Sequence, residues 1–215
     1  SSVEEVRLFA LRTSCDVSRT RPDTPEVCPL LWETFITKAK DSSPLIRKEF
    51  AERVSELIYA HHDMRSPIWK CLEQLVVDMD EDVRIAALQT VCQTARKKLE
   101  AVNENLIIGC TERIRDRKTE VRKIALKYLL ALYKDIVKRE DSTKSDRGVI
   151  AIIAKKVIMA SKATEAMTDE RVMIEKGLIH SLLPMELDMR KRMELLVEMS
   201  TRFNSHEIRY SYYII

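Results

Sequence analysis

The fold is decided by a short stretch, residues 116–122, whose sequence is DRKTEVR. Its pattern, Asp-x4-[Val/Ile]-Arg, occurs in two earlier copies at residues 41–47 and 78–84, and the Val-Arg half occurs alone at residues 6–7. The arginines of these copies are Arg7, Arg47, Arg84 and Arg122. They lie 40, 37 and 38 residues apart, so the chain repeats a unit of almost constant length.

A period near 40 residues is the length of one HEAT or armadillo unit, a helical hairpin that buries its apolar face only by stacking on neighbouring hairpins. The composition favours helix, since the 215 residues include 3 glycines. Average usage near 7% predicts roughly 15. The six prolines fall where the apolar period breaks, at positions that tolerate proline. We therefore predict an all-α fold, an α-solenoid of HEAT repeats.

The apolar period of 3.6 residues predicts a series of paired helices. Their expected ranges are 2–19, 28–40, 45–61, 67–78, 81–98, 104–116, 119–138, 147–162, 168–183 and 187–203. The repeat pattern divides the chain into residues 1–138 with a clear Val-Arg signature, a charged mobile loop at 139–147, and divergent HEAT-like repeats at 148–215. The first helix lacks a preceding partner and the last residues are apolar, whereas terminal repeats need a polar outer face. We therefore expect the chain to be part of a longer solenoid.

One face of the helix expected at 119–138 is apolar. It comprises Val121, Ala125, Tyr128, Leu129, Leu132 and Ile136, which share one stripe at helical spacing. The aspartate six positions before each arginine lies in the turn that starts the helix, where its carboxylate can accept backbone amides. Because buried charges usually occur in pairs, we expect this aspartate to bind the arginine of the same or the adjacent repeat.

Composition limits the function classes. The 37 basic and 34 acidic residues leave a formal charge of +3, so net charge alone does not imply a nucleic-acid ligand. The five cysteines lie far apart in apolar contexts, and we interpret them as core thiols in a reducing compartment. The sequence has no run of eighteen apolar residues and no signal-peptide order at its start, so we expect a soluble intracellular protein.

The sequence carries no catalytic motif. It has no Gly-rich phosphate loop, no G-x-S-x-G and no histidine pair at the spacing of a zinc protease. The cluster His61-His62-Asp63 lies in a turn and lacks the further ligands of a closed metal site. Cys92 and Cys110 have no neighbouring base in the sequence. We predict that the protein is not an enzyme and that it binds no metal.

The face opposite the apolar stripe is basic. On the helix at 119–138 it presents Lys123, Lys127, Leu130 and Lys134, three lysines around a leucine that we expect to be exposed. The corresponding positions of the earlier repeats, among which Glu52 is the one acid, are Leu8, Arg12, Cys15 and Arg19, then Lys48, Glu52, Ser55 and Tyr59, then Ile85, Gln89, Cys92 and Arg96. We call these positions together the basic ridge. The basic turn Arg113, Arg115, Arg117 and Lys118 adds candidate polyanion contacts.

We interpret the basic ridge as a binding surface for an acidic, partly apolar peptide or a polyphosphate. The candidate partner-binding residues are Lys123, Lys127, Leu130, Tyr133, Lys134 and Arg96. Lysine charge would steer the partner, and Leu130 or Tyr133 would supply contact area. The alternative is a solvated charged face, as on most helix exteriors. Aromatic interleaving of the kind that single-strand binders use is absent, so we expect no direct base-specific reading of nucleic acid.

Several ordered strings match the pattern of a known family. They are LWETF at residues 31–35 with PLIR at 44–47, ARKKLEAVNENL at 95–106, DRK, VRK and LYK within 116–134, and EK with LP between 175 and 184. The chain thereby resembles, over roughly residues 1–205, the cohesin-regulatory family named for precocious dissociation of sister chromatids. A single Val-Arg-Lys helix would be shared by many HEAT proteins, and the order of the strings is what carries the resemblance.

The resemblance implies a non-enzymatic regulator that binds the kleisin subunit of cohesin and modulates sister chromatid cohesion and cohesin release. It implies further partners, namely the Wings-apart-like releasing factor, sororin and the cohesin acetyltransferase, and a nuclear location on chromatin through cohesin. Some members bind inositol hexakisphosphate, although no motif places that site here. The alternative is a generic HEAT-repeat adaptor for transport or assembly. A karyopherin-like groove would be acidic, opposite in sign to the basic ridge.

Overall fold

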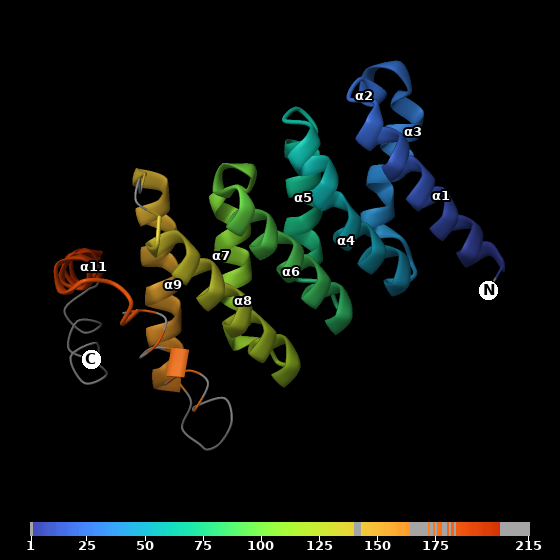
Figure 1. Cartoon of the computed structure of the whole chain (residues 1–215). Helices are drawn as coiled ribbons and strands as arrows, with labels where there is room; N and C mark the ends of the chain where they lie inside the picture. The colour runs from blue at the N-terminus through green and yellow to red at the C-terminus, as the bar shows by residue number, and fades with distance from the viewer. Residues whose placement is uncertain are drawn as a thin grey trace. The chain divides into compact units, whose positions relative to one another are not determined.

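The computed structural model describes residues 2–139, 143–163 and 184–202, together with residues 172, 174, 176, 177, 180 and 182. Within this part of the chain every regular element is a helix, which confirms the predicted all-α fold (Figure 1). The chain forms two compact units, residues 1–109 and 110–215, and the boundary falls inside α7 (Glu104–Glu112). The segments expected at 1–138, 139–147 and 148–215 were defined by the similarity of the repeats. The two units are defined by compactness, so the two divisions have different boundaries. We describe each unit separately.

The first unit consists of paired helices. They are α1 (Ser2–Thr20), α2 (Thr24–Val27), α3 (Pro29–Thr37), η1 (Lys38–Lys40), α4 (Pro44–Ala60), α5 (Arg65–Leu75), α6 (Glu81–Lys97), η2 (Leu99–Ala101) and the first part of α7. The helices α1, α4 and α6 agree with their expected ranges to within one residue. The single helix expected at 28–40 is instead α3 followed by the 3-10 turn η1, and the short helix α2 was not predicted.

Two layers of helices form the core of this unit. The second helices of successive hairpins, α1, α4 and α6, pack side by side, and the first helices α3 and α5 also contact each other. Phe35 of α3 packs on Phe50 of α4, with ring centroids 5.1 Å apart, and stacks on Trp32 at 5.6 Å. Aromatic rings at these distances add stabilisation beyond the area that they bury.

The second unit contains the remainder of α7, η3 (Arg113–Arg115), α8 (Thr119–Val137), α9 (Lys144–Ala163) and α11 (Met189–Arg202). Helix α8 packs on α9 and η3, and α11 packs on α9. The predicted apolar stripe of α8 is buried as expected: Val121, Ala125, Leu129, Leu132 and Ile136 are 0% exposed. Tyr128 differs, since it is half-buried. The helix expected at 168–183 lies mostly outside the described residues.

Helix α9 begins at Lys144, three residues before the expected start. Thr143 and Asp146 form a capping box, in which the Thr143 amide donates to Asp146 Oδ2 at 2.7 Å and the Asp146 amide donates to Thr143 Oγ1 at 3.1 Å. Residues 140–142 lie outside the described part of the chain. The charged sequence after them therefore starts a helix and does not continue the expected loop to residue 147.

The repeated aspartates occupy the turns before α4, α6 and α8. Each carboxylate accepts the backbone amide two residues on, as Asp78 Oδ1 does from the Asp80 amide at 2.9 Å. The repeat arginine of the same copy donates to the aspartate's carbonyl oxygen, at 2.8 Å for Arg47, 2.8 Å for Arg84 and 2.9 Å for Arg122. These bonds fix the turn that starts each second helix, which confirms the role expected for the aspartate.

Two of these aspartates also join neighbouring repeats in the first unit. Arg7 binds the Asp41 carboxylate at 3.1 Å, and Arg47 binds Asp78 through two hydrogen bonds of 2.8 Å each. The carboxylate thus pairs with the arginine of the preceding repeat, one of the two expected partners. Burial raises the pKa of Asp78, but the bonds from Arg47 and the Asp80 amide outweigh it, so that the pKa lies below its ordinary value.

The cysteines are all free thiols. Cys15, Cys71, Cys92 and Cys110 are buried, as predicted for core thiols, whereas Cys28 is exposed at the start of α3. Burial raises the pKa of Cys15 and of Cys71 to about 11. Such thiols stay protonated at neutral pH and are poor nucleophiles. Among the described residues, no helix is long and apolar enough to cross a membrane.

Candidate partner-binding surface

The basic ridge of the second unit lies on α8, where the lysines differ in exposure. Lys127 is exposed, with its ammonium 5.9 Å from the centroid of the Tyr128 ring, while Lys123 and Lys134 are half-buried. Lysine stems commonly cover apolar surface while their charged ends reach water. The three predicted cations therefore share one helix, and the structure leaves Lys127 as the most accessible of them.

Two predicted contact residues are buried, so the expectation of an exposed Leu130 is wrong. Leu130 is 8% exposed and Tyr133 is 0% exposed. Gly177 lies so close to Leu130 that a Cβ atom at this glycine would stand 2.4 Å from Leu130 Cδ1. The Tyr133 hydroxyl donates to the carbonyl oxygen of Leu182 at 2.9 Å, and burial raises the pKa of this phenol. Residues of the later chain thus cover the apolar part of the ridge.

Lys134 is engaged by the same later segment. Its ammonium binds Glu186 at 2.9 Å, and Lys138 lies 3.8 Å from the same carboxylate. The hydrogen bond from Lys134 is the main reason why the pKa of Glu186 lies below its ordinary value. Because this pair lies at the surface, it contributes little to stability.

The four cations of the basic turn differ in their contacts. Arg113 binds Asp116 at 3.1 Å, and Arg115 donates from Nη2 to the Met159 carbonyl oxygen at 3.0 Å. Arg117 and Lys118 are exposed. Arg113 and Arg115 therefore tie η3 to the following turn and to α9, and Arg115 is exposed as Arg117 and Lys118 are.

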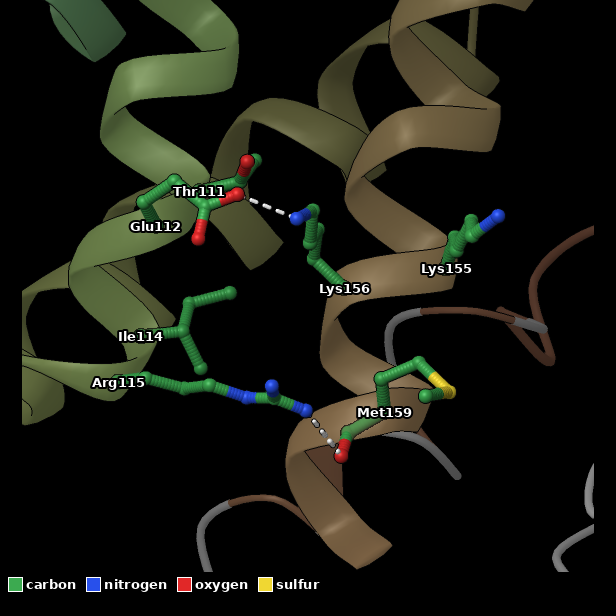
Figure 2. Close-up of a pocket in the computed structure, with 7 residues that line it drawn as sticks. All are labelled: Thr111, Glu112, Ile114, Arg115, Lys155, Lys156 and Met159. Carbon is green, nitrogen blue, oxygen red and sulfur yellow. Dashed lines mark hydrogen bonds and ion pairs between the residues drawn. The ribbon is translucent and has the colours of Figure 1, made fainter. Parts of the chain in front are cut away.

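A pocket of about 130 Å³ opens beside this turn (Figure 2). Its lining residues are Thr111, Glu112, Ile114, Arg115, Lys155, Lys156 and Met159. Lys156 points at Glu112 and pairs with it, whereas Lys155 extends away from Arg115. The two lysines of α9 were not predicted as site residues, because they occur in a mostly apolar helix without a repeat partner. Their adjacency in that helix was the available signal.

In the first unit, two arginines of the basic ridge form ion pairs with glutamates. Arg12 binds Glu49 at 2.7 Å and Arg19 lies 3.4 Å from Glu56. The bonds from Arg12 and Arg53 outweigh burial and hold the pKa of Glu49 below its ordinary value. Arg96, the candidate residue on α6, is exposed. Glutamates beside the basic ridge, Glu49 and Glu56, thus neutralise part of its charge in this unit, and the helical spacing of the ridge residues did not predict them.

The described residues contain no group of three or more His, Cys, Asp or Glu side chains that could hold a metal ion. His61 lies with Nε2 3.0 Å from the Arg19 carbonyl oxygen, at the ends of α4 and α1. His62 and Asp63 are exposed side chains 3.7 Å apart. The cluster singled out in the sequence therefore lies at helix ends, where one of its histidines meets a free carbonyl group.

The stacked helix pairs and the repeated Asp-Arg contacts define a solenoid of HEAT repeats. Comparison with known proteins is more specific. The model of the family "Sister chromatid cohesion protein PDS5 protein" matches residues 1–215. The chain belongs to the PDS5 family.

Curated relatives include the sister chromatid cohesion proteins PDS5 homolog A-B of Xenopus laevis and PDS5 homolog A of Homo sapiens, each 25% identical over 190 residues or 88% of this chain. PDS5 homolog B of Gallus gallus is 23% identical over 203 residues. The chain spans about 14% of the length of each. A solved structure described as a Pds5-Scc1 complex superposes with a TM-score of 0.74 at 17% identity, covering 88% of this chain and 29% of that one.

Proposed function

We propose that this chain is a non-enzymatic cohesin-regulatory scaffold that binds the kleisin subunit of cohesin. The observation that carries the proposal is the match of the PDS5 family model to all 215 residues. The similar fold of the Pds5 chain in a complex with Scc1 supports it. By this reading the protein modulates sister chromatid cohesion and cohesin release in the nucleus, on chromatin. The Wings-apart-like factor, sororin and the cohesin acetyltransferase are the further proposed partners.

We assign the kleisin contact to the exposed part of the basic ridge on α8. Lys127 is exposed and Lys123 is half-buried on the same helix, four residues apart, so one acidic segment can reach both. Lys134 joins them once the partner replaces Glu186. Leu130 and Tyr133 act behind the surface, by holding the segment at Gly177 and Leu182 against α8. Arg117 and Lys118, which are exposed in the turn before α8, extend the same positive surface.

The test is a pull-down of the kleisin Scc1 by the chain that carries Lys123→Glu and Lys127→Glu. Reversing two charges at a surface contact is expected to weaken binding by about 10-fold or more. The matched control is Lys191→Glu, which changes an exposed lysine of α11 in the same unit. Circular dichroism should show the same helicity for all three proteins. Unchanged kleisin binding by the double variant would refute the residue assignment.

Direct duplex binding makes a different prediction. Contacts with phosphates release counterions, so that affinity falls steeply with salt. A peptide that also buries apolar side chains depends less on salt. Titrations of labelled kleisin peptide and of a DNA duplex at two salt concentrations separate the two functions.

The polyphosphate alternative finds weaker support in the pocket beside η3. Its residues do not fit inositol hexakisphosphate, because a carboxylate, Glu112, lines it among three cations and pairs with Lys156. Arg115 is committed to the Met159 carbonyl oxygen. We therefore favour the peptide-binding scaffold.

A further inference from the structure

The pocket beside η3 is bounded by two polar contacts that join the α7–η3 segment to α9 (Figure 2). Lys156 pairs with Glu112 at one end, and at the other end Arg115 Nη2 donates to the Met159 carbonyl oxygen at 3.0 Å. In both segments the two residues are three positions apart, so the contacts are separated by one helical turn, roughly 5 Å. Ile114 points into the space between them. The pocket is therefore a slot with a charged contact at each end.

The floor of this slot is apolar. Ile114 is 4% exposed, and the half-buried Met159 lines the slot from α9. Methionine has a flexible side chain that adapts to ligands of different shape. An apolar group that leaves water for this floor gains free energy in proportion to the area it buries. The slot can thus hold one apolar side chain between its two charged ends.

The junction is closed in the preceding copy of the repeat. Counted from the repeat aspartate, the counterpart of Ile114 is Val76 at the end of α5, which is 1% exposed. A Cβ atom at Gly109 of α7 would lie 3.6 Å from Val76 Cγ1, so the two elements are in van der Waals contact there. At η3 the long side chains of Arg115 and Lys156 span the junction instead. The slot is therefore a local feature of this junction and does not follow from the repeat itself.

The charge of the slot favours an anion. Three of its lining residues are cations and one is a carboxylate, Glu112. An arginine has five N–H donors, and the bond to Met159 uses one of those of Arg115, so this exposed guanidinium can also bind a carboxylate. Lys156 adds positive charge from the other end of the slot. Because Glu112 repels additional negative charge, the slot favours one carboxylate over a doubly charged phosphate group.

We propose that the slot binds an extended peptide segment in which an apolar residue of about leucine size stands two positions from an acidic residue. Side chains at this separation lie on the same side of an extended segment. The apolar side chain packs on Ile114 and Met159, and the carboxylate binds Arg115. The inference goes beyond the proposed function, because the kleisin contact is assigned to Lys123 and Lys127, and neither lines the slot.

The test is a titration of the 215-residue chain, labelled at its isoleucine and methionine methyl groups for NMR, with the peptide acetyl-Leu-Ala-Glu-amide. The methyl signals of Ile114 and Met159 should shift and saturate in the millimolar range that suits so small a ligand. Two control peptides, acetyl-Leu-Ala-Gln-amide without the charge and acetyl-Ala-Ala-Glu-amide without the larger apolar side chain, should each bind about 10-fold more weakly. Met79, which is 86% exposed in the first unit, reports non-specific binding and should not shift.

Variants separate the slot from the rest of the basic surface. Arg115→Gln should bind the glutamate and glutamine peptides equally, because the carboxylate loses its partner. The matched control is Arg117→Gln, which changes an exposed arginine of the same turn that does not line the slot. The double variant Lys123→Glu with Lys127→Glu should keep the shifts at Ile114 and Met159, even if it loses kleisin.

Equal binding of the glutamate and glutamine peptides by the unaltered chain would overturn the inference. So would shifts at Met79 as large as those at Ile114, an equal effect of Arg117→Gln and Arg115→Gln, or loss of the shifts in the double variant on α8. Displacement of the peptide by inorganic phosphate at lower concentrations than by acetate would mean that the slot prefers phosphate, which also overturns the inference.

Discussion

The described contacts that hold the helices together differ between the two units. In residues 1–109 neighbouring hairpins are joined by a contact that repeats, the arginine of one copy on the aspartate of the next, as in Arg7 with Asp41 and Arg47 with Asp78. In residues 110–215 the face of α8 is held by contacts that occur once, from Gly177 and Leu182. A repeated signature predicts repeated contacts well, and it says nothing about a face that a non-repeating segment covers.

The largest effect should come from the aromatic core of the first unit. Phe50→Ala removes a fully buried ring that packs on Phe35, and such truncations cost about 3–5 kcal/mol. We expect faster amide exchange across α3 and α4 and an earlier urea transition for residues 1–109. Lys48→Ala, a change on the same helix at a half-buried lysine, is the control and should shift the transition little. A loss below about 1 kcal/mol would show that the aromatic cluster is not central.

The second effect tests the repeated ion pair itself. Arg47→Ala leaves the Asp78 carboxylate, whose side chain is 11% exposed, without its bidentate partner. Breaking such a pair from one side costs about 3 kcal/mol. The double variant Arg47→Ala with Asp78→Ala should lose less than the sum of the two single variants, because neither charge is then left unpaired. Additive losses in chemical denaturation would mean that the two residues do not act together.

A smaller effect is expected in the second unit. Tyr133→Phe keeps the ring and removes the hydroxyl that donates to the Leu182 carbonyl oxygen, at a cost of about 1–2 kcal/mol. Amide exchange at Gly177, Leu182 and Glu186 should increase, while α1 to α6 should be unaffected. The control is Tyr59→Phe, which removes a hydroxyl from the first unit that donates to the Gln93 carbonyl oxygen at 3.4 Å. If exchange rises equally in both variants, the Tyr133 hydroxyl does not hold the segment.

The smallest expected effect is on the stability of the protein at acidic pH. The pKa of Asp78 is lower in the folded protein than in the unfolded chain, where an aspartate has a pKa of about 3.9. The stabilising contribution of the ionised Asp78 carboxylate is therefore fully present above about pH 4–5. It is lost as the pH falls through the folded pKa. Asp78→Asn should therefore be less stable than the parent protein at pH 7 and should lose less stability between pH 5 and pH 3. Denaturation midpoints that fall in parallel for both proteins would contradict this assignment.

Much of the fold followed from the spacing of four arginines. That register predicted the positions of α1, α4 and α6, the buried stripe of α8 and the role of the repeated aspartates. The prediction worked because a solenoid buries the same positions in each copy. It was less accurate for α3, where Pro29 and the turn η1 set the ends of the helix by local backbone preferences that leave little trace in an apolar period.

The candidate surface was harder to predict. Helical periodicity identifies the face of α8 that is turned away from the core, but it does not show whether another segment covers that face. Leu130 and Tyr133 are buried by residues 47 and 49 positions further along the chain, Gly177 and Leu182, which share no signature with the repeats. Lys127 lies outside these contacts in the part of the chain that the structure describes, and there the predicted exposure held.

The double engagement of Arg47 also has a mechanical consequence. Its guanidinium binds the turn of its own hairpin through the Asp41 carbonyl oxygen, and it binds the next hairpin through the Asp78 carboxylate. A force that separates the two hairpins must therefore break the two hydrogen bonds from Arg47 to Asp78. The bond from Arg47 Nη1 to the Asp41 carbonyl oxygen uses a different donor and can persist, so the turn that starts α4 should outlast the contact between the hairpins.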